Sequence, residues 1–183
     1  MAAIQTPLPI IIDVEASGFG KGSYPIEIGL AMADGVTSRC FLITPLPEWQ
    51  HWDEGAEQVH GISRATLMRH GKPAQWVAEQ LNQLLWGQTV CSDAWAHDSS
   101  WIGKLYDAVD SHPRFRITTL RDQLSDDQLK FWQQARNELT RVHQQRHRAS
   151  TDARLIQQTF ALSQRFAKES FSSPLPCQGS GSI

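Results

Sequence analysis

Short apolar blocks near the beginning of the chain predict three β-strands. Pro9–Val14 is the first candidate, because Ile10–Ile12 at its centre form a continuous apolar run, which suits a strand that is buried on both faces. Ile26–Met32 and Val36–Ile43 are the second and third candidates. Asp34 and Gly35 stand between them, and Asp-Gly is a preferred two-residue hairpin turn. The chain is therefore expected to open with a three-stranded, largely antiparallel unit.

In the rest of the chain, apolar residues at helical spacing alternate with two further strand candidates. Ser63 is placed to cap a short helix, and Pro73 stands in the first turn of a helix that Gly87 ends. Five helices are expected: one over 63–68, one over 73–86, one that starts near residue 98, one over 125–143, and a last one that includes residue 152 and runs to Phe166. The two further strands are expected over 89–92 and 115–118. This order predicts an α/β fold with a mixed sheet covered by helices.

The length of the chain predicts one domain. The 183 residues fit a single unit, which we assign to residues 1–170. Residues 171–183 contain two prolines and a Gly-Ser-Gly-Ser run, which predict a flexible C-terminal tail. The net charge of -2 excludes a polycationic nucleic-acid coat. It does not exclude a nucleic-acid enzyme, because net charge does not say where the charges lie.

Targeting and cysteine patterns point to a reduced, cytoplasmic protein. No apolar run approaches the roughly 20 residues that span a bilayer, so no membrane association is expected. The first twelve residues lack the basic start of a secretory signal peptide. The three cysteines form no Cys-x-x-Cys pair, which argues against a disulfide framework or a zinc knuckle.

The first group of candidate functional residues is Asp13-Val14-Glu15, directly after the apolar run. Side chains i and i+2 of a strand point to the same face, so the two carboxylates would project together. Two carboxylates held that close repel each other unless a cation neutralises them, and Mg²⁺ with its oxygen ligands is the natural candidate. The plain alternative is an acidic strand end that enters a glycine turn.

Two further acidic residues stand where helices are expected to begin. Asp98 follows the 89–92 strand, and an N-cap role would also explain it. Asp152 falls in the first turn of the last helix, with His147 in the loop before it. Stabilisation by the helix dipole and a solvated histidine are the plain alternatives there. Because the apolar face of the last helix would dock on the sheet, its beginning is expected near the strand ends.

Taken together, these groups resemble the DEDD exonuclease superfamily, in the subgroup whose third motif contains histidine (DEDDh). Asp-x-Glu, a single Asp and His-x4-Asp follow in that order within residues 9–162. Proofreading subunits of DNA polymerases, ribonuclease T and oligoribonuclease belong to this subgroup. The resemblance implies a ribonuclease H-like fold with an antiparallel hairpin and parallel strands in one sheet. The middle motif departs from the His-Asn-Ala-x-Phe-Asp of many relatives, so Asp93 competes with Asp98 for its acidic position.

The resemblance implies a 3′-5′ exonuclease that acts on single-stranded RNA or DNA and releases nucleoside 5′-monophosphates. By similarity, Asp13, Glu15, Asp98 and Asp152 would hold two Mg²⁺ or Mn²⁺ ions. Such ions lie about 3.5–4 Å apart and stabilise the attacking and leaving oxygens of a phosphoryl displacement. His147 would take the proton of the attacking water, because a neutral imidazole suits a general base near pH 7.

Several residues are candidates for holding the 3′ end. Gly18 would let the backbone approach the terminal nucleotide, and Phe19 would stack on a base. His60 lies in a segment that resembles the entry to a helix lining the substrate pocket of the family. Between Arg114 and Arg154, nine basic and five acidic residues suggest contacts to phosphates. The predicted substrate-binding residues are Ser17, Gly18, Phe19, His60 and Arg148.

Two other functions fit parts of the sequence. Adjacent His97 and Asp98 would suit an all-helical metal phosphohydrolase, but Asp13 and Glu15 on a strand would then have no purpose. An accessory module that binds nucleic acid or a polymerase, with little activity, is the alternative from another class. Relatives of this size are often homodimers, so a homodimer and an association with a polymerase are the protein partners that the resemblance implies.

Overall fold

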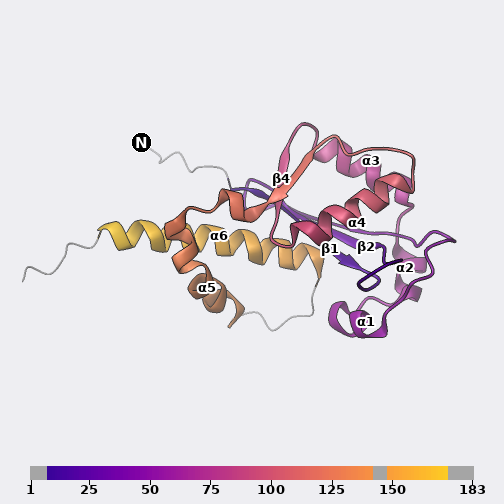
Figure 1. The fold of residues 1–183 in the computed structure, drawn as a ribbon, viewed down its shortest axis with the longest axis horizontal. Coiled ribbons are helices and arrows are strands. Elements are labelled where there is room, and N and C mark those ends of the chain that lie inside the picture. Colours follow the sequence, from indigo (N-terminus) through magenta and orange to yellow (C-terminus); the bar gives the residue numbers. More distant parts are fainter. Residues whose placement is uncertain (1–7, 142–147, 173–183) are drawn as a thin grey trace, which may run out of the picture.

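The computed structural model describes residues 8–141 and 148–172 of the chain, which form one five-stranded sheet with helices on both faces (Figure 1). The sheet has the strand order β3-β2-β1-β4-β5. The strands are β1 (Ile10–Ala16), β2 (Pro25–Ala31), β3 (Ser38–Leu42), β4 (Thr89–Ser92) and β5 (Arg116–Thr119). The helices are α1 (Glu54–His60), α2 (Arg64–His70), α3 (Ala74–Leu84), α4 (Trp95–Asp107), α5 (Asp126–Thr140) and α6 (Ala149–Ser172), with a 3₁₀ turn at Leu120–Gln123.

The pairing of the strands confirms the predicted mixed sheet. β1 and β3 both run antiparallel to β2, while β4 runs parallel to β1 and to β5. The central strand β1 therefore has an antiparallel neighbour on one side and a parallel neighbour on the other. This combination of a hairpin and parallel strands under helices is a ribonuclease H-like fold, as expected.

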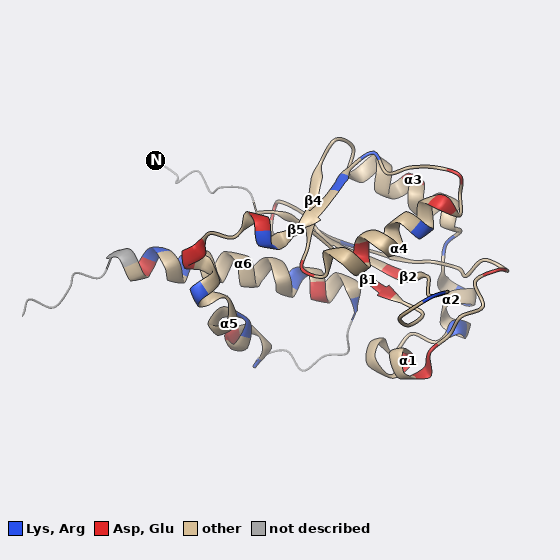
Figure 2. Cartoon of the chain, in the orientation of Figure 1, with Lys and Arg blue, Asp and Glu red and all other residues tan. Residues whose placement is uncertain are grey.

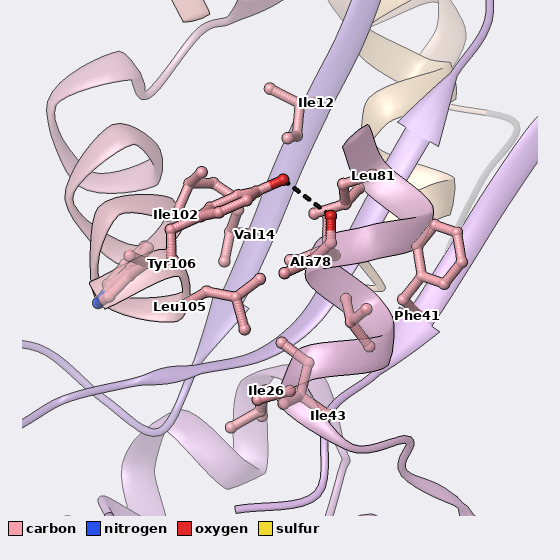
Figure 3. Close-up of a cluster of buried hydrophobic side chains, with 14 of the residues drawn as sticks. Ile12, Val14, Ile26, Phe41, Ile43, Ala78, Leu81, Ile102, Leu105 and Tyr106 are labelled. Atoms are coloured by element: carbon pink, nitrogen blue, oxygen red, sulfur yellow. Dashed lines mark hydrogen bonds between the residues drawn. The ribbon is translucent and has the colours of Figure 1, made fainter. Parts of the chain in front are cut away.

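Helices α3 and α4 cover one face of the sheet with a wholly apolar core. Alternate residues of β1 (Ile10, Ile12 and Val14) and of β2 point toward these helices. Figure 3 shows Leu81 of α3 and Leu105 of α4 within this cluster. The Tyr106 hydroxyl crosses between the two helices and donates to the carbonyl oxygen of Ala78 at 3.0 Å. That bond satisfies a polar group that would be costly to bury without a partner.

Helix α6 covers the opposite face, and α5 packs against α6 (Figure 1). Here Ile11 and Ala31 of the sheet contact Ile156 and Phe160 of the helix. Farther along α6, Gln157 donates its side-chain amide to the carbonyl oxygens of Pro9 at 2.8 Å and Met32 at 2.9 Å. The middle of α6 is thus held to the beginning of β1 and the end of β2. None of the described helices combines the length and the apolar character that a membrane-spanning segment needs.

Two local predictions were wrong. A two-residue hairpin turn was expected at Asp34-Gly35, but the connection between β2 and β3 covers residues 32–37. The Asp34 carboxylate accepts from the backbone N–H of Val36 at 2.9 Å and of Thr37 at 2.8 Å, which holds a wider loop and delays the third strand to Ser38. Helix α1 was not expected at all. Its signal was Asp53, whose side chain caps it by accepting from Gly55 N–H at 2.7 Å.

Candidate active site

A cavity of about 240 Å³ opens at the carboxyl end of β1. Its wall combines strand β1, the loop after it, helix α1 and the first turns of α4. The lining residues are Asp13, Val14, Glu15, Ala16, Gly18, Phe19, Ala56, Val59, His60, Ala94, His97, Asp98 and Trp101. The lining thus combines acidic groups with aromatic and aliphatic side chains.

Three carboxylates meet beside the cavity. Asp13 and Glu15 project from β1 toward the α6 face, and Asp152 comes from the first turn of α6. One ligand oxygen from each residue lies within 4.8 Å of the others. The expected strand ended at Val14, but β1 continues to Ala16 because its pairing with β2 extends to Pro25. A regular strand therefore fixes both carboxylates on one face.

The surroundings of Asp13 disfavour its charged form. Burial raises the pKa of Asp13 well above its usual range, and the negative charges of Asp98, Glu15 and Asp152 raise it further. Positive charge brought to the cluster would favour the ionised form of Asp13. The set fits a hard divalent cation, because such ions bind carboxylate oxygens.

Asp98 reaches the same cavity from α4. The helix was expected to begin near Asp98, but α4 begins earlier, at Trp95, and Asp98 is a buried residue of its first turn. The Ser92 hydroxyl donates to the Asp98 carboxylate at 2.5 Å. Burial raises the pKa of Asp98 to about 7, despite the opposing effect of the Ser92 hydrogen bond. Asp93, the competing residue for this motif, is exposed instead and pairs with Arg136 at 3.4 Å.

Three aromatic side chains in the cavity wall contact one another. Phe19 is 67% exposed and meets the His97 ring edge-on, with 5.5 Å between the ring centroids. His97 in turn stacks on Trp101 at 5.6 Å. The Trp101 indole donates to the Ser23 hydroxyl at 3.0 Å, which fixes the base of the group. A flat, partly exposed aromatic surface thus lies next to a carboxylate cluster.

His60, at the end of α1, is 2% exposed and lines the cavity. Its Nδ1 accepts from the backbone N–H of Ile62 at 3.0 Å, so the neutral ring carries its proton on Nε2. Burial lowers the pKa of His60, which favours that neutral form. Nε2 has no hydrogen-bond partner among the described residues. His60 therefore carries a buried N–H donor without a partner among the described residues.

Ser17 and Gly18 shape the loop that carries Phe19. The buried Ser17 hydroxyl accepts from Tyr24 N–H at 3.1 Å and contacts His51 Nδ1 at 3.2 Å, and Ser17 is not among the residues that line the cavity. Gly18 has a φ of 139°, and a Cβ there would lie 2.6 Å from the Cβ of Asp53. Both residues thus have roles inside the protein, and their predicted contacts with substrate remain predictions.

Arg148 lies next to the carboxylate cluster, but its guanidinium pairs with Glu27 of β2. The Arg148 side chain is 43% exposed, so part of it is accessible to a ligand. Its predicted contact with phosphates remains a prediction. His147, the predicted general base, lies outside the described residues. Sequence reasoning missed Glu27 and the role of His97 in the aromatic wall. An acidic residue within the apolar run 26–32 was the available signal for Glu27.

No protein-family model matches the chain, and no curated protein matches its sequence. Solved structures do share its fold. A zinc-bound form of the complex of E. coli exonuclease I with single-stranded DNA superposes with a TM-score of 0.61 at 13% identity, over 90% of this chain and 41% of the other. A product-bound exonuclease I gives 0.63 at 12% identity, over 92% and 46%. The chain therefore spans less than half of these exonuclease I chains, and the likeness establishes the fold.

Proposed function

We propose that the protein is a metal-dependent 3′-5′ exonuclease of the DEDD superfamily, with the histidine of the DEDDh subgroup. The observation that carries the proposal is the convergence of Asp13, Glu15 and Asp152 within 4.8 Å, beside a cavity that Asp98 also lines. The fold shared with exonuclease I, a protein solved with single-stranded DNA, supports the same conclusion. Single-stranded RNA or DNA with a free 3′ end is the proposed substrate.

Asp13, Glu15, Asp98 and Asp152 are the proposed ligands for two Mg²⁺ or Mn²⁺ ions. When bound, such ions stabilise the negative charge of a phosphoryl displacement and lower the pKa of an attacking water. The raised pKa values of Asp13 and Asp98 support this role, because a cation relieves the repulsion that raises them. Asp98 stands apart from the other three and is fixed by Ser92, so we propose that it completes the set from the α4 side.

His147 is the proposed general base. It precedes Arg148 and Ala149 in sequence, and α6 begins at Ala149. Asp152, in the first turn of this helix, belongs to the carboxylate cluster. An imidazole on this segment would accept the proton of the attacking water near pH 7, where its neutral form predominates.

The aromatic wall is the proposed site for the terminal nucleoside. The exposed rings of Phe19 and His97 offer surfaces on which a base of any sequence can stack, each worth about 1–3 kcal/mol, and Trp101 supports His97 from below. The Nε2–H of His60 would donate to an oxygen of the terminal nucleotide. Gly18 and Ser17 hold the Phe19 loop in place beside it.

The basic residues give the proposed path for the phosphate backbone. Figure 2 shows acidic segments on β1 and in the first turn of α6 at the same end of the sheet, with basic segments on α5 and α6. Arg148, next to the cluster, is the proposed first phosphate contact. If these residues bind phosphates, the affinity for single strands falls steeply as salt concentration rises. An affinity that does not change with salt would contradict this path.

A 3′-labelled single-stranded oligonucleotide tests the proposal. Incubated with Mg²⁺ or Mn²⁺, the wild-type protein is expected to release labelled mononucleotide, and EDTA is expected to stop the reaction. Asp13→Asn is expected to be inactive, whereas Asp107→Asn, at an exposed residue at the end of α4, is expected to keep wild-type activity. Parallel RNA, DNA, duplex and dinucleotide substrates identify the preferred class.

Binding without turnover by the wild-type protein would contradict the exonuclease and favour the accessory module instead. In that case the protein would retain single strands at low salt while releasing no mononucleotide. The predicted homodimer and polymerase association are independent of this result, and the mass of the protein in solution, alone and with a polymerase, tests them.

A further inference from the structure

Glu27, in the middle of the sheet, is a buried carboxylate outside the proposed ligand set. Its side chain is 0% exposed, and it lies on β2 directly opposite Glu15 of β1. Residues paired in this way project from the same face, so two negative side chains stand side by side. Such a pair is unfavourable unless another group compensates for it.

The compensation comes from the beginning of α6. The Arg148 guanidinium donates to both oxygens of Glu27, from Nε at 3.0 and 3.1 Å and also from Nη2. The backbone N–H of Ala149 donates to the same carboxylate at 2.9 Å. Burial alone would raise the pKa of Glu27, but these bonds and one from the Cys40 thiol lower it. The ionised carboxylate is therefore the stable form, and it binds the two residues at which α6 starts.

Gly29, two residues along the same strand, lets the helix reach this position. It lies opposite Asp13, and a Cβ on Gly29 would be 2.1 Å from the carbonyl carbon of Ala149. No side chain larger than hydrogen fits there without moving the helix. Glu27 and Gly29 together thus set both the depth and the position of the first turn of α6.

This first turn carries a carboxylate of the cluster. The carbonyl oxygen of Arg148 accepts from the backbone N–H of Asp152 at 2.9 Å and of Thr151 at 2.8 Å. A short series of bonds therefore leads from Glu27 through Arg148 to the backbone of Asp152. The carboxylate of Asp152 then meets Asp13 and Glu15 within 4.8 Å.

We propose that Glu27 is a positioning residue that holds Asp152 in the geometry needed to bind a divalent cation with Asp13 and Glu15. An ion pair that buries a carboxylate is a weak source of stability, since apolar residues of similar volume often serve as well. Apolar contacts and Gln157 hold the rest of α6 to the sheet. The ion pair between Glu27 and Arg148 at the start of the helix therefore indicates that the first turn of α6 must be precisely positioned. The inference rests on the proposed metal site and adds a residue that does not touch the metal.

Binding of Mn²⁺ to the protein alone, measured by calorimetry without nucleic acid, tests the proposal. Glu27→Gln keeps the shape but loses the charge, and it is expected to weaken Mn²⁺ binding about 10–100-fold, as substitutions behind metal ligands commonly do. Arg148→Lys keeps the positive charge but loses the two-pronged geometry, and a smaller loss in the same direction is expected. It serves as the second variant if Glu27→Gln does not fold.

Phe160→Leu is the matched control, because it weakens the packing of the same helix far from its first turn. It is expected to lower the melting temperature while leaving Mn²⁺ affinity within about twofold of wild type. Wild-type affinity in folded Glu27→Gln or Arg148→Lys would overturn the positioning role, while the metal site would stand. If the wild-type protein bound Mn²⁺ no better than Asp13→Asn, the metal site itself would be refuted.

Discussion

The two faces of the sheet share the same strands but differ in what their side chains do. Toward α3 and α4, β1 presents Ile10, Ile12 and Val14, which are all part of one apolar core. Toward α6, the same strand presents Ile11 and then two carboxylates, Asp13 and Glu15. One face is apolar along the whole strand, and the other is apolar only until the site begins.

The two faces of β1 thus have different roles: one contributes to the stability of the fold, and the other carries proposed catalytic carboxylates. The α3/α4 face removes apolar surface from water, which is the main favourable contribution to folding. On the α6 face, charge is buried at a cost, visible in the raised pKa of Asp13 and in the ion pair that Glu27 requires. A site of this kind is stable because the opposite face of the same strand supplies the core.

The largest effect that follows from this comparison is the loss of hydrolysis in Asp152→Asn. If Asp152 binds catalytic metal, the turnover number should fall by at least about 10³-fold, because each tenfold loss corresponds to about 1.4 kcal/mol of transition-state stabilisation. In EDTA the variant should be at least as stable as wild type, since it removes one of several clustered charges. Initial rates on a labelled oligonucleotide and urea denaturation measure the two quantities. A variant with wild-type turnover would contradict the assignment.

The opposite result is expected on the α3/α4 face. Leu105→Ala removes a fully buried side chain from the apolar core, and such changes cost about 2–5 kcal/mol of unfolding free energy. The turnover number per folded molecule should stay close to wild type, because Leu105 does not line the cavity and lies about two turns from Asp98 along α4. Urea denaturation and active-site-normalised rates separate the effects. A loss of turnover comparable to that of Asp152→Asn would show that the two faces are not independent.

The sequence predicted the sheet and the positions of Asp13, Glu15 and Asp152 within their elements, because both depend on local patterns. Alternation along β1 placed Asp13 and Glu15 on one face, and the position of Asp152 in the first turn of the last helix was correct. Helix α1 was missed because its residues show little apolar periodicity, although Asp53 and Gly61 are ordinary capping residues. The start of α4 was predicted three residues late, near Asp98, which is a buried residue of the first turn.

Contacts between distant segments could not be predicted in the same way. Glu27 and Arg148 are 121 residues apart, and neither residue type alone indicates a buried pair. The same holds for His60, whose burial depends on how α1 folds over the end of β1. The prediction of a two-residue turn between β2 and β3 was wrong for a local reason, because the Asp34 side chain can hold a six-residue loop as well as a tight turn.

The stability of the metal-free protein is expected to depend on pH through Asp98, the acidic residue that α4 brings to the site. The pKa of Asp98 is about 7 in the folded protein, against 3.8 ordinarily, so the folded state binds more protons between these values. Its contribution to the free energy of unfolding is therefore complete at low pH and is lost as pH rises toward 7 and above. In EDTA, Asp98→Asn should gain stability relative to wild type as pH rises from 5 to about 8. Thermal unfolding measures this difference, and a difference that is constant with pH would contradict it.

The smallest expected changes in stability come from substituting one glycine on each side of the sheet. Gly103 of α4 has open space where a Cβ would stand, whereas a Cβ on Gly29 would meet the backbone of Ala149. Gly103→Ala should therefore stabilise the protein by about 0.5–1 kcal/mol through the lower entropy of the unfolded chain. Gly29→Ala should destabilise it by about 1–3 kcal/mol, because the first turn of α6 must move. Urea denaturation measures both. Because helix α6 carries Asp152, Gly29→Ala should also weaken Mn²⁺ binding. A destabilised variant with wild-type Mn²⁺ affinity would show that the carboxylate cluster tolerates a shift of α6.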